Sequence, residues 1–181
     1  MSIVLGKGIN DVKGSSRTWQ YSLWVNMLQR CYGNNICNSS YVGCEVSEYF
    51  LTLSNFISWV DKFGKPLKGW CLDKDLLGDG RLYSEDTCCF LPPIINLIFK
   101  KHICSNIGLL QGVNQQPGSG RFKASRSMYG KLICLGTYGT QEEAHQVYLD
   151  ATTEYVHKLA EEYKDALSYN VYAVLKAYSA S

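Results

Sequence analysis

The sequence predicts an α+β protein built from two modules. Apolar residues recur at helical spacing over residues 16–32 and 47–64, and three strand-like runs separated by turn residues follow residue 108. The chain has 181 residues, enough for one large domain or two small ones. We therefore expect a largely helical module over residues 1–107. A three-stranded antiparallel sheet packed on a helix should occupy residues 108–181, with a further C-terminal helix.

The composition indicates a cytoplasmic protein with a buried core and no membrane association. Hydrophobic residues make up 46% of the chain, yet no apolar run reaches the roughly 18 residues of a membrane span. The first residues lack the basic segment and apolar core of a signal peptide. The eight cysteines are therefore expected to be reduced, buried thiols rather than disulfides. A zinc site gathered from Cys31, Cys44 and Cys88 is not favoured, because the chain has no CxxC pair.

The first module should contain two amphipathic helices after an irregular, Gly-rich arm over residues 1–15. One helix begins near Ser16, and the other ends at Gly64, where Pro66 follows. The apolar positions expected to be buried are Trp19, Leu23, Met27 and Cys31 in the first helix and Phe50, Leu53, Ile57 and Val60 in the second.

The segment "GWCLDKDLLGDGRLYSEDTCCFLPPIIN" (69–96) predicts two strands and a helix. A strand over "WCLDKDLL" would turn at "GDG" and return through "YSEDTCCFLP", and a helix would begin at Pro93. Alternation along a strand places Asp73 and Asp75 on one face, where two carboxylates can hold a divalent cation. We expect both on a partly exposed strand edge, facing a hydrated cleft beside the helix that carries Asn96.

This order of strand, turn, strand and helix resembles the ββα-metal finger of HNH nucleases. With "W..ML.RCY", "Y.GC.V", "F..F..W" and "LDKDLL..G..YS.DTCCF.P..IN", residues 16–100 are similar to phage-encoded proteins labelled HNH endonuclease-like. The resemblance implies that Asp73 and Asn96 hold a divalent cation, Mg²⁺ or Mn²⁺, while Asp75 assists catalysis. Lys74 stands at the catalytic position of the family's base His. A lysine amine is protonated at neutral pH, so it accepts a proton from water poorly.

The charge of the second module is segregated. Residues 108–139 hold four basic residues and no acid, whereas residues 140–181 hold three basic and seven acidic residues. An acid-free basic segment is a candidate surface for phosphates. The alternative is a solvated hairpin whose charges pair with the acidic helix behind it.

Three strands with breaks at "PGSG" and "MYGK" are followed by a capping box, Thr140 to Glu143, and a helix. With "GV" at 112–113, Phe122, "LGTY" at 135–138 and Ala144, this pattern resembles the plant ethylene-response-factor (Apetala-type) DNA-binding domain. The resemblance implies that the open sheet face contacts double-stranded DNA. The matching positions are Gln111, Asn114, Gln116, Ser125, Ser127 and Lys131, with Arg121, Lys123 and Arg126 as phosphate contacts.

Two hypotheses follow for the whole chain. In the first, a phage-encoded DNA-binding protein with a degenerate, largely inactive finger acts as a regulator or as an inhibitor of a host protein. In the second, the chain is a metal-dependent, homing-like HNH endonuclease. The lysine at the position of the base histidine favours the first. Helical spacing over residues 167–178 predicts a last helix, which either packs back or binds a partner.

Overall fold

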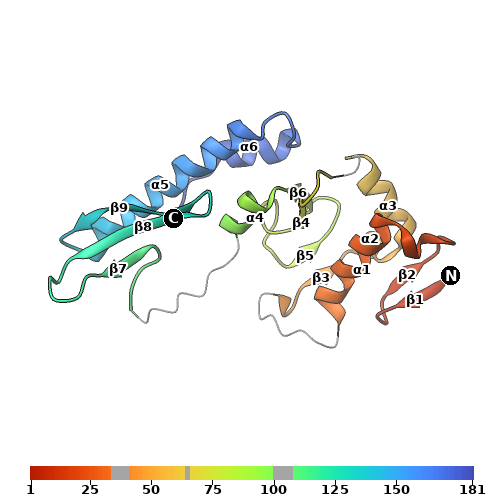
Figure 1. Cartoon of the computed structure of the whole chain (residues 1–181). Coiled ribbons are helices and arrows are strands. Elements are labelled where there is room, and N and C mark those ends of the chain that lie inside the picture. Colours follow the sequence, from red (N-terminus) through yellow and green to blue (C-terminus); the bar gives the residue numbers. More distant parts are fainter. Residues whose placement is uncertain (34–40, 64–65, 100–107) are drawn as a thin grey trace. The chain divides into compact units, whose positions relative to one another are not determined.

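The computed structural model describes residues 1–33, 41–63, 66–99 and 108–181. They form two compact units, one up to residue 100 and one from residue 101 onward (Figure 1). Helices and strands occur in both units, which confirms the α+β class. The module boundary expected at residue 107 lies outside the described residues. None of the described helices is long and apolar enough to cross a membrane.

The first unit surrounds one core with short helices and two-stranded pairings. Its helices are η1 (Ser15–Arg17), α1 (Trp19–Tyr32), α2 (Glu48–Leu51), α3 (Leu53–Asp61) and α4 (Pro93–Phe99). Its strands are β1 (Ser2–Val4), β2 (Gly8–Asn10), β3 (Glu45–Val46), β4 (Cys71–Asp73), β5 (Leu82–Tyr83) and β6 (Cys89–Leu91). The antiparallel pairs are β1 with β2 and β4 with β6, whereas β3 and β5 pair in parallel.

Helix α1 confirms the first expected helix. The Thr18 side chain caps its N-terminus by accepting a hydrogen bond from the Tyr21 amide. The helix buries Trp24, Met27, Leu28 and Cys31, while Trp19 and Leu23 are partly buried. Trp24 also donates from Nε1 to the Phe50 carbonyl at 2.7 Å, so its polar atom is satisfied inside the core.

Two expectations for the first unit were wrong. Residues 1–15 do not form an irregular arm, because β1 and β2 pair as a hairpin. The helix expected over residues 47–64 is two helices separated at Thr52, whose backbone is extended and forms a parallel bridge with Ile9 of β2. The N-terminal hairpin thus pairs with the extended backbone at Thr52, where side-chain periodicity alone predicts a continuous helix.

The expected order of strand, strand and helix is present in β4, β6 and α4. Strand β4 ends at Asp73, however, so Asp75 lies in the following loop and does not share a strand face with Asp73. The returning segment is also divided, because β5 pairs with β3 and only β6 pairs with β4. Pro93 occupies the first position of α4, as predicted.

The second unit confirms the predicted three-stranded antiparallel sheet packed on a helix. Its elements are β7 (Val113–Gln115), β8 (Phe122–Met128), β9 (Lys131–Tyr138), α5 (Gln141–Glu162) and α6 (Tyr169–Ala177). The predicted capping box of Thr140 and Glu143 begins α5. Helix α6 folds back along α5, where Tyr172 and Lys176 both contact Glu161 (Figure 1).

Gly112 packs directly beneath Tyr148 of α5. Its φ of +77° lies in the left-handed region, and a Cβ atom there would overlap the Tyr148 ring. Its carbonyl also accepts a hydrogen bond from the Ser125 amide at 2.9 Å. Only glycine therefore lets the start of β7 approach the helix this closely.

We predict that Gly112→Ala destabilises the second unit far more than Gly118→Ala. Both glycines have nearly the same φ, +77° and +76°, but nothing lies within 4 Å of a Cβ at Gly118. The left-handed backbone should cost about 1–2 kcal/mol in each variant, and overlap with Tyr148 should add about 1–3 kcal/mol in Gly112→Ala alone. Urea unfolding followed by far-ultraviolet circular dichroism would measure both. Equal losses in the two variants would contradict the packing of Tyr148 on Gly112.

Candidate functional site

Lys74 is a buried cation between two tyrosine rings. Its side chain is 3% exposed, and Nζ lies 5.5 Å from the ring centroid of Tyr41 and 5.4 Å from that of Tyr83. Nζ also forms an ion pair with Asp75 Oδ1 at 2.8 Å. Because ring faces and a carboxylate both attract a cation, the ammonium group is stabilised although it is withdrawn from water.

The environment of Lys74 keeps its amine protonated. Burial by itself lowers the pKa of Lys74, but the hydrogen bond and the charge of Asp75 outweigh burial and raise the pKa above its ordinary value. A general base at neutral pH needs a pKa near that pH. A protonated Lys74 is poorly suited to replace the base histidine of the HNH finger.

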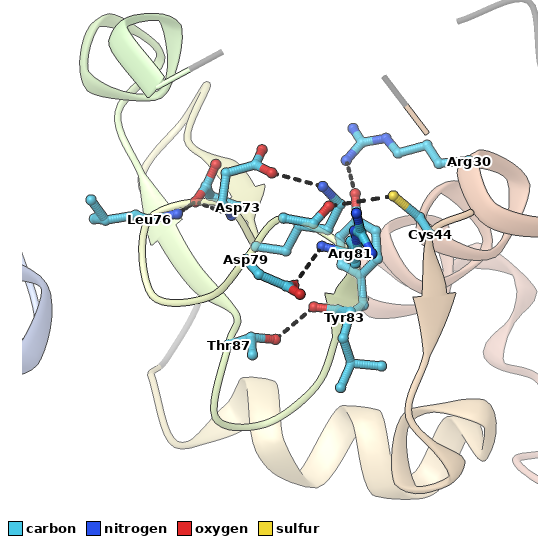
Figure 2. Close-up of polar contacts among 12 residues, drawn as sticks. Arg30, Cys44, Asp73, Leu76, Asp79, Arg81, Tyr83 and Thr87 are labelled. Atoms are coloured by element: carbon cyan, nitrogen blue, oxygen red, sulfur yellow. Dashed lines mark hydrogen bonds and ion pairs between the residues drawn. The ribbon is translucent and has the colours of Figure 1, made fainter. Parts of the chain in front are cut away.

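Asp73 uses its carboxylate to hold the backbone at the end of β4. Its Oδ2 accepts hydrogen bonds from the amides of Asp75 and Leu76, both at 2.9 Å (Figure 2). Burial raises the pKa of Asp73, and the two amide hydrogen bonds oppose that rise in part. The side chain is 3% exposed, so the expectation of an exposed strand edge was wrong for Asp73, whereas Asp75 is exposed. The carboxylate is turned inward because it terminates the strand as an Asx-type turn.

The two aspartates of the expected cation site already have partners within the chain. Asp75 is held by the Lys74 ammonium, and Asp73 is held by two backbone amides. Asn96 is partly buried in α4, which lies beside β4. Among the described residues, no group of three or more His, Cys, Asp or Glu side chains could hold a metal ion. A divalent cation held by both carboxylates would have to compete with the ammonium group at Asp75 and with the amides at Asp73 Oδ2.

The loop that follows Asp75 completes the environment of the cation. Gly80 has a φ of +78°, and a Cβ there would lie 2.5 Å from Asp75 Oδ1, so glycine leaves room for the counter-ion of Lys74. The Gly80 carbonyl accepts a hydrogen bond from the Cys44 thiol at 3.5 Å. Arg30 donates to the Tyr83 hydroxyl at 3.3 Å (Figure 2). Arg30 also lies over the Tyr41 ring. Arg30 and Lys74 therefore both contact Tyr41 and Tyr83.

Most of the described cysteines are buried, as expected. Burial raises the pKa of Cys31 and of Cys88 to about 12, so both thiols are protonated at neutral pH. Cys134 is an exception, because it lies exposed on β9 rather than in an apolar core. Cys37 and Cys104 lie outside the described residues.

The sheet of the second unit leaves one face uncovered by α5. Residues paired directly across antiparallel strands point to the same side. The rows on the side away from α5 are Asn114 with Lys123 and Thr137, Ser125 with Cys134, and Ser127 with Leu132. We call these seven residues the open face. Ser125 is only 7% exposed, so the DNA contact expected at Ser125 is not accessible. Gln111 precedes β7, and Gln116 and Arg121 lie in the turn between β7 and β8, where the Gln116 amide donates to the Arg121 carbonyl.

Two of the predicted DNA-binding residues lie on the opposite side. Arg126 is 8% exposed, donates to the Tyr148 hydroxyl at 3.1 Å, and lies over the rings of Tyr148 and Tyr155. Lys131 pairs with Met128 on the helix side of the sheet. The prediction of a phosphate contact at Arg126 was therefore wrong, because alternation along β8 turns this side chain under α5.

Several residues around Lys74 and on the open face could not be found from the sequence. Tyr41, Tyr83 and Arg30 surround Lys74 from separate elements, so no local spacing relates them. Leu132, Cys134 and Thr137 share the open face, but alternation along β9 is interrupted by a register shift opposite Ala124 and Ser125. Comparison of the chain with protein-family models, with curated proteins and with solved structures found no match.

Proposed function

We propose that this chain binds double-stranded DNA through the open face of its second unit. The observation that carries the proposal is the row of Asn114, Lys123 and Thr137 on a sheet face that α5 leaves uncovered. Amide and hydroxyl groups can hydrogen-bond base edges or phosphates, and lysine neutralises phosphate charge. No acidic residue occurs between residues 108 and 139, so nothing within these strands repels a phosphate backbone.

The remaining side chains of the open face and its turn support the same function. Arg121 is exposed and donates to the Thr137 carbonyl at 3.0 Å, which holds its guanidinium group beside the sheet. Leu132 is 72% exposed, and an apolar group of this kind can contact a thymine methyl in the major groove. Within the described strands and turns of the sheet, two cations, Lys123 and Arg121, lie on or beside this face, so we expect weak, salt-sensitive binding with modest sequence preference.

In this proposal the first unit acts as a scaffold without catalysis. Lys74 is held protonated and Asp73 terminates a strand, so both charged groups have structural partners. The chain would then serve as a DNA-binding regulator or as an inhibitor of a host protein, as its resemblance to phage proteins implies.

Replacing Arg121 and Lys123 together with Ala should weaken binding to duplex DNA of any sequence. Each lost phosphate contact should flatten the dependence of log K on log salt by about 0.9, so the double variant should lose about twice that slope. Fluorescence anisotropy with a labelled duplex over a range of salt concentrations would measure affinity and slope together.

Lys131→Ala is the matched control, because it removes the same charge from the same hairpin on the helix side. It should leave affinity and slope nearly unchanged. Two results would contradict the proposal: no binding by the wild type at low salt, or an equal loss in Lys131→Ala and in Lys123→Ala.

The second candidate is a divalent-metal-dependent DNA endonuclease. It is favoured by the order of β4, β6 and α4, in which Asp73 ends one strand and Asn96 lies in the helix that follows its partner strand. We prefer the binding function, because the ammonium group of Lys74 is paired within the finger and no base of suitable pKa stands at that position.

We predict that the wild-type chain does not nick supercoiled plasmid in Mg²⁺ or Mn²⁺. Asp73→Asn is the variant that tests any nicking seen, because an amide oxygen can still accept the backbone hydrogen bonds that Asp73 makes. Metal-dependent nicking that disappears in Asp73→Asn, while circular dichroism shows an intact fold, would establish the endonuclease instead. Lys74→His should then increase the nicking, because it supplies a base with a pKa near neutrality.

A further inference from the structure

The second unit contains an open surface cavity of about 410 Å³ on the helix side of its sheet, and most of the residues that line it are exposed. It lies between the turn that joins β8 to β9 and the middle of α5. Its lining residues are Met128, Tyr129, Lys131, Ile133, Ala151, Glu154, Tyr155 and Lys158. Small-molecule sites in proteins usually occupy about 300–1,000 Å³ and are mostly apolar with a few polar groups. The size and the lining of this cavity fit that class.

The space in the cavity results from the small size of one of the side chains that line it. Ala151, Glu154, Tyr155 and Lys158 follow a spacing of three and four, so they share one face of α5. Ala151 is the smallest of them, and its short side chain leaves space opposite Ile133 and Met128 of the sheet. Nearer the start of α5, the larger Tyr148 covers Gly112 and leaves no such space.

Two tyrosines fix the walls at the turn. The Tyr129 amide donates to the Tyr155 hydroxyl at 2.9 Å, and the two rings meet edge to face with centroids 5.2 Å apart. The Tyr129 hydroxyl is held in turn by Glu162 of α5. Because hydrogen bonds and ring packing set both aromatic walls, the cavity is built before any ligand arrives.

Cations outnumber acids around the cavity, where Glu154 belongs to the lining and Glu162 lies behind Tyr129. Lys131 stands on the sheet wall and Lys158 on the helix wall, where it lies over the Tyr129 ring. Arg126 adds a third cation behind the lining, stacked on Tyr155 and paired across the strands with Ile133. Its Nε is buried without a hydrogen-bond partner in the described part of the chain. Glu154 is the one acid in the lining, and no ion pair joins it to either lysine among the described residues.

We propose that this cavity binds a small apolar acid, with an aromatic or alkyl body between the tyrosine walls and a carboxylate near Lys131 and Lys158. Apolar walls bury the body of such a ligand, and the two ammonium groups compensate its charge. A neutral ligand of the same shape would leave the excess positive charge unbalanced. The cavity and the open face lie on opposite sides of the sheet, so binding of the acid does not depend on the proposed binding of DNA.

The test compares 2-naphthoate with the neutral 2-naphthamide, which has a similar shape, by isothermal titration calorimetry on the full chain. The acid should bind at least tenfold more tightly than the amide. Replacing Lys131 and Lys158 together with Gln should weaken binding of the acid at least tenfold and leave binding of the amide unchanged. These two lysines act here through charge alone, so glutamine is the suitable replacement.

A second pair of variants separates filling of the cavity from loss of charge. Ala151→Leu should occupy part of the cavity opposite Met128 and Ile133 and weaken binding of both ligands while both lysines remain. Ala173→Leu, on an exposed position of α6, should bind both ligands as the wild type does. The proposal is overturned if naphthoate shows no binding at millimolar concentration, if the amide binds as tightly as the acid, or if a folded Ala151→Leu binds naphthoate as tightly as the wild type does.

Discussion

A buried ammonium group organises the candidate site of the first unit. Lys74 is held by a carboxylate at 2.8 Å and by the faces of Tyr41 and Tyr83. Each cation–ring contact is worth about 0.5–2 kcal/mol, depending on desolvation, so two rings and one carboxylate can offset much of the cost of burial. The loop after β4 takes its shape from this arrangement, because Gly80 must lie against Asp75. The three charges of "DKD" thus have three roles: Asp73 terminates a strand, Lys74 is the buried cation, and Asp75 is its exposed counter-ion.

The second unit also contains a buried cation in contact with tyrosine rings, but the charges around it differ. Arg126 also lies over two tyrosine rings and is also buried, but no carboxylate forms an ion pair with it among the described residues. An uncompensated buried cation is costly and is seldom retained without a partner. Arg126 lies against Tyr155, which lines the cavity. Lys123 and Arg121 instead lie on or beside the open face. The sheet therefore separates two groups of cations, one toward the helix and one toward solvent.

The local features of the fold could be predicted from the sequence, and the long-range ones could not. The first helix (expected from Ser16 and beginning at Trp19), the capping box at Thr140 and the breaks between β7, β8 and β9 depend on neighbouring residues, and the sequence predicts each of them. The break at Thr52 depends on Ile9, far away in the chain, so helical periodicity missed it. The candidate site around Lys74 depends on such long-range contacts, so its geometry is harder to predict from the sequence. Asp73 was expected to face water because its backbone partners lie in a loop that was read as a continuing strand.

The protonation state of Lys74 decides whether the first unit is a scaffold or a nuclease finger. Nuclear magnetic resonance of the lysine ammonium groups in labelled protein can follow its titration, with Lys74→Arg identifying the signal. Lys74 should remain protonated up to and beyond the ordinary lysine pKa of 10.5, because Asp75 stabilises its charged form. A pKa near neutrality would contradict the account, since Lys74 would then be a base and the finger would have the group that catalysis needs.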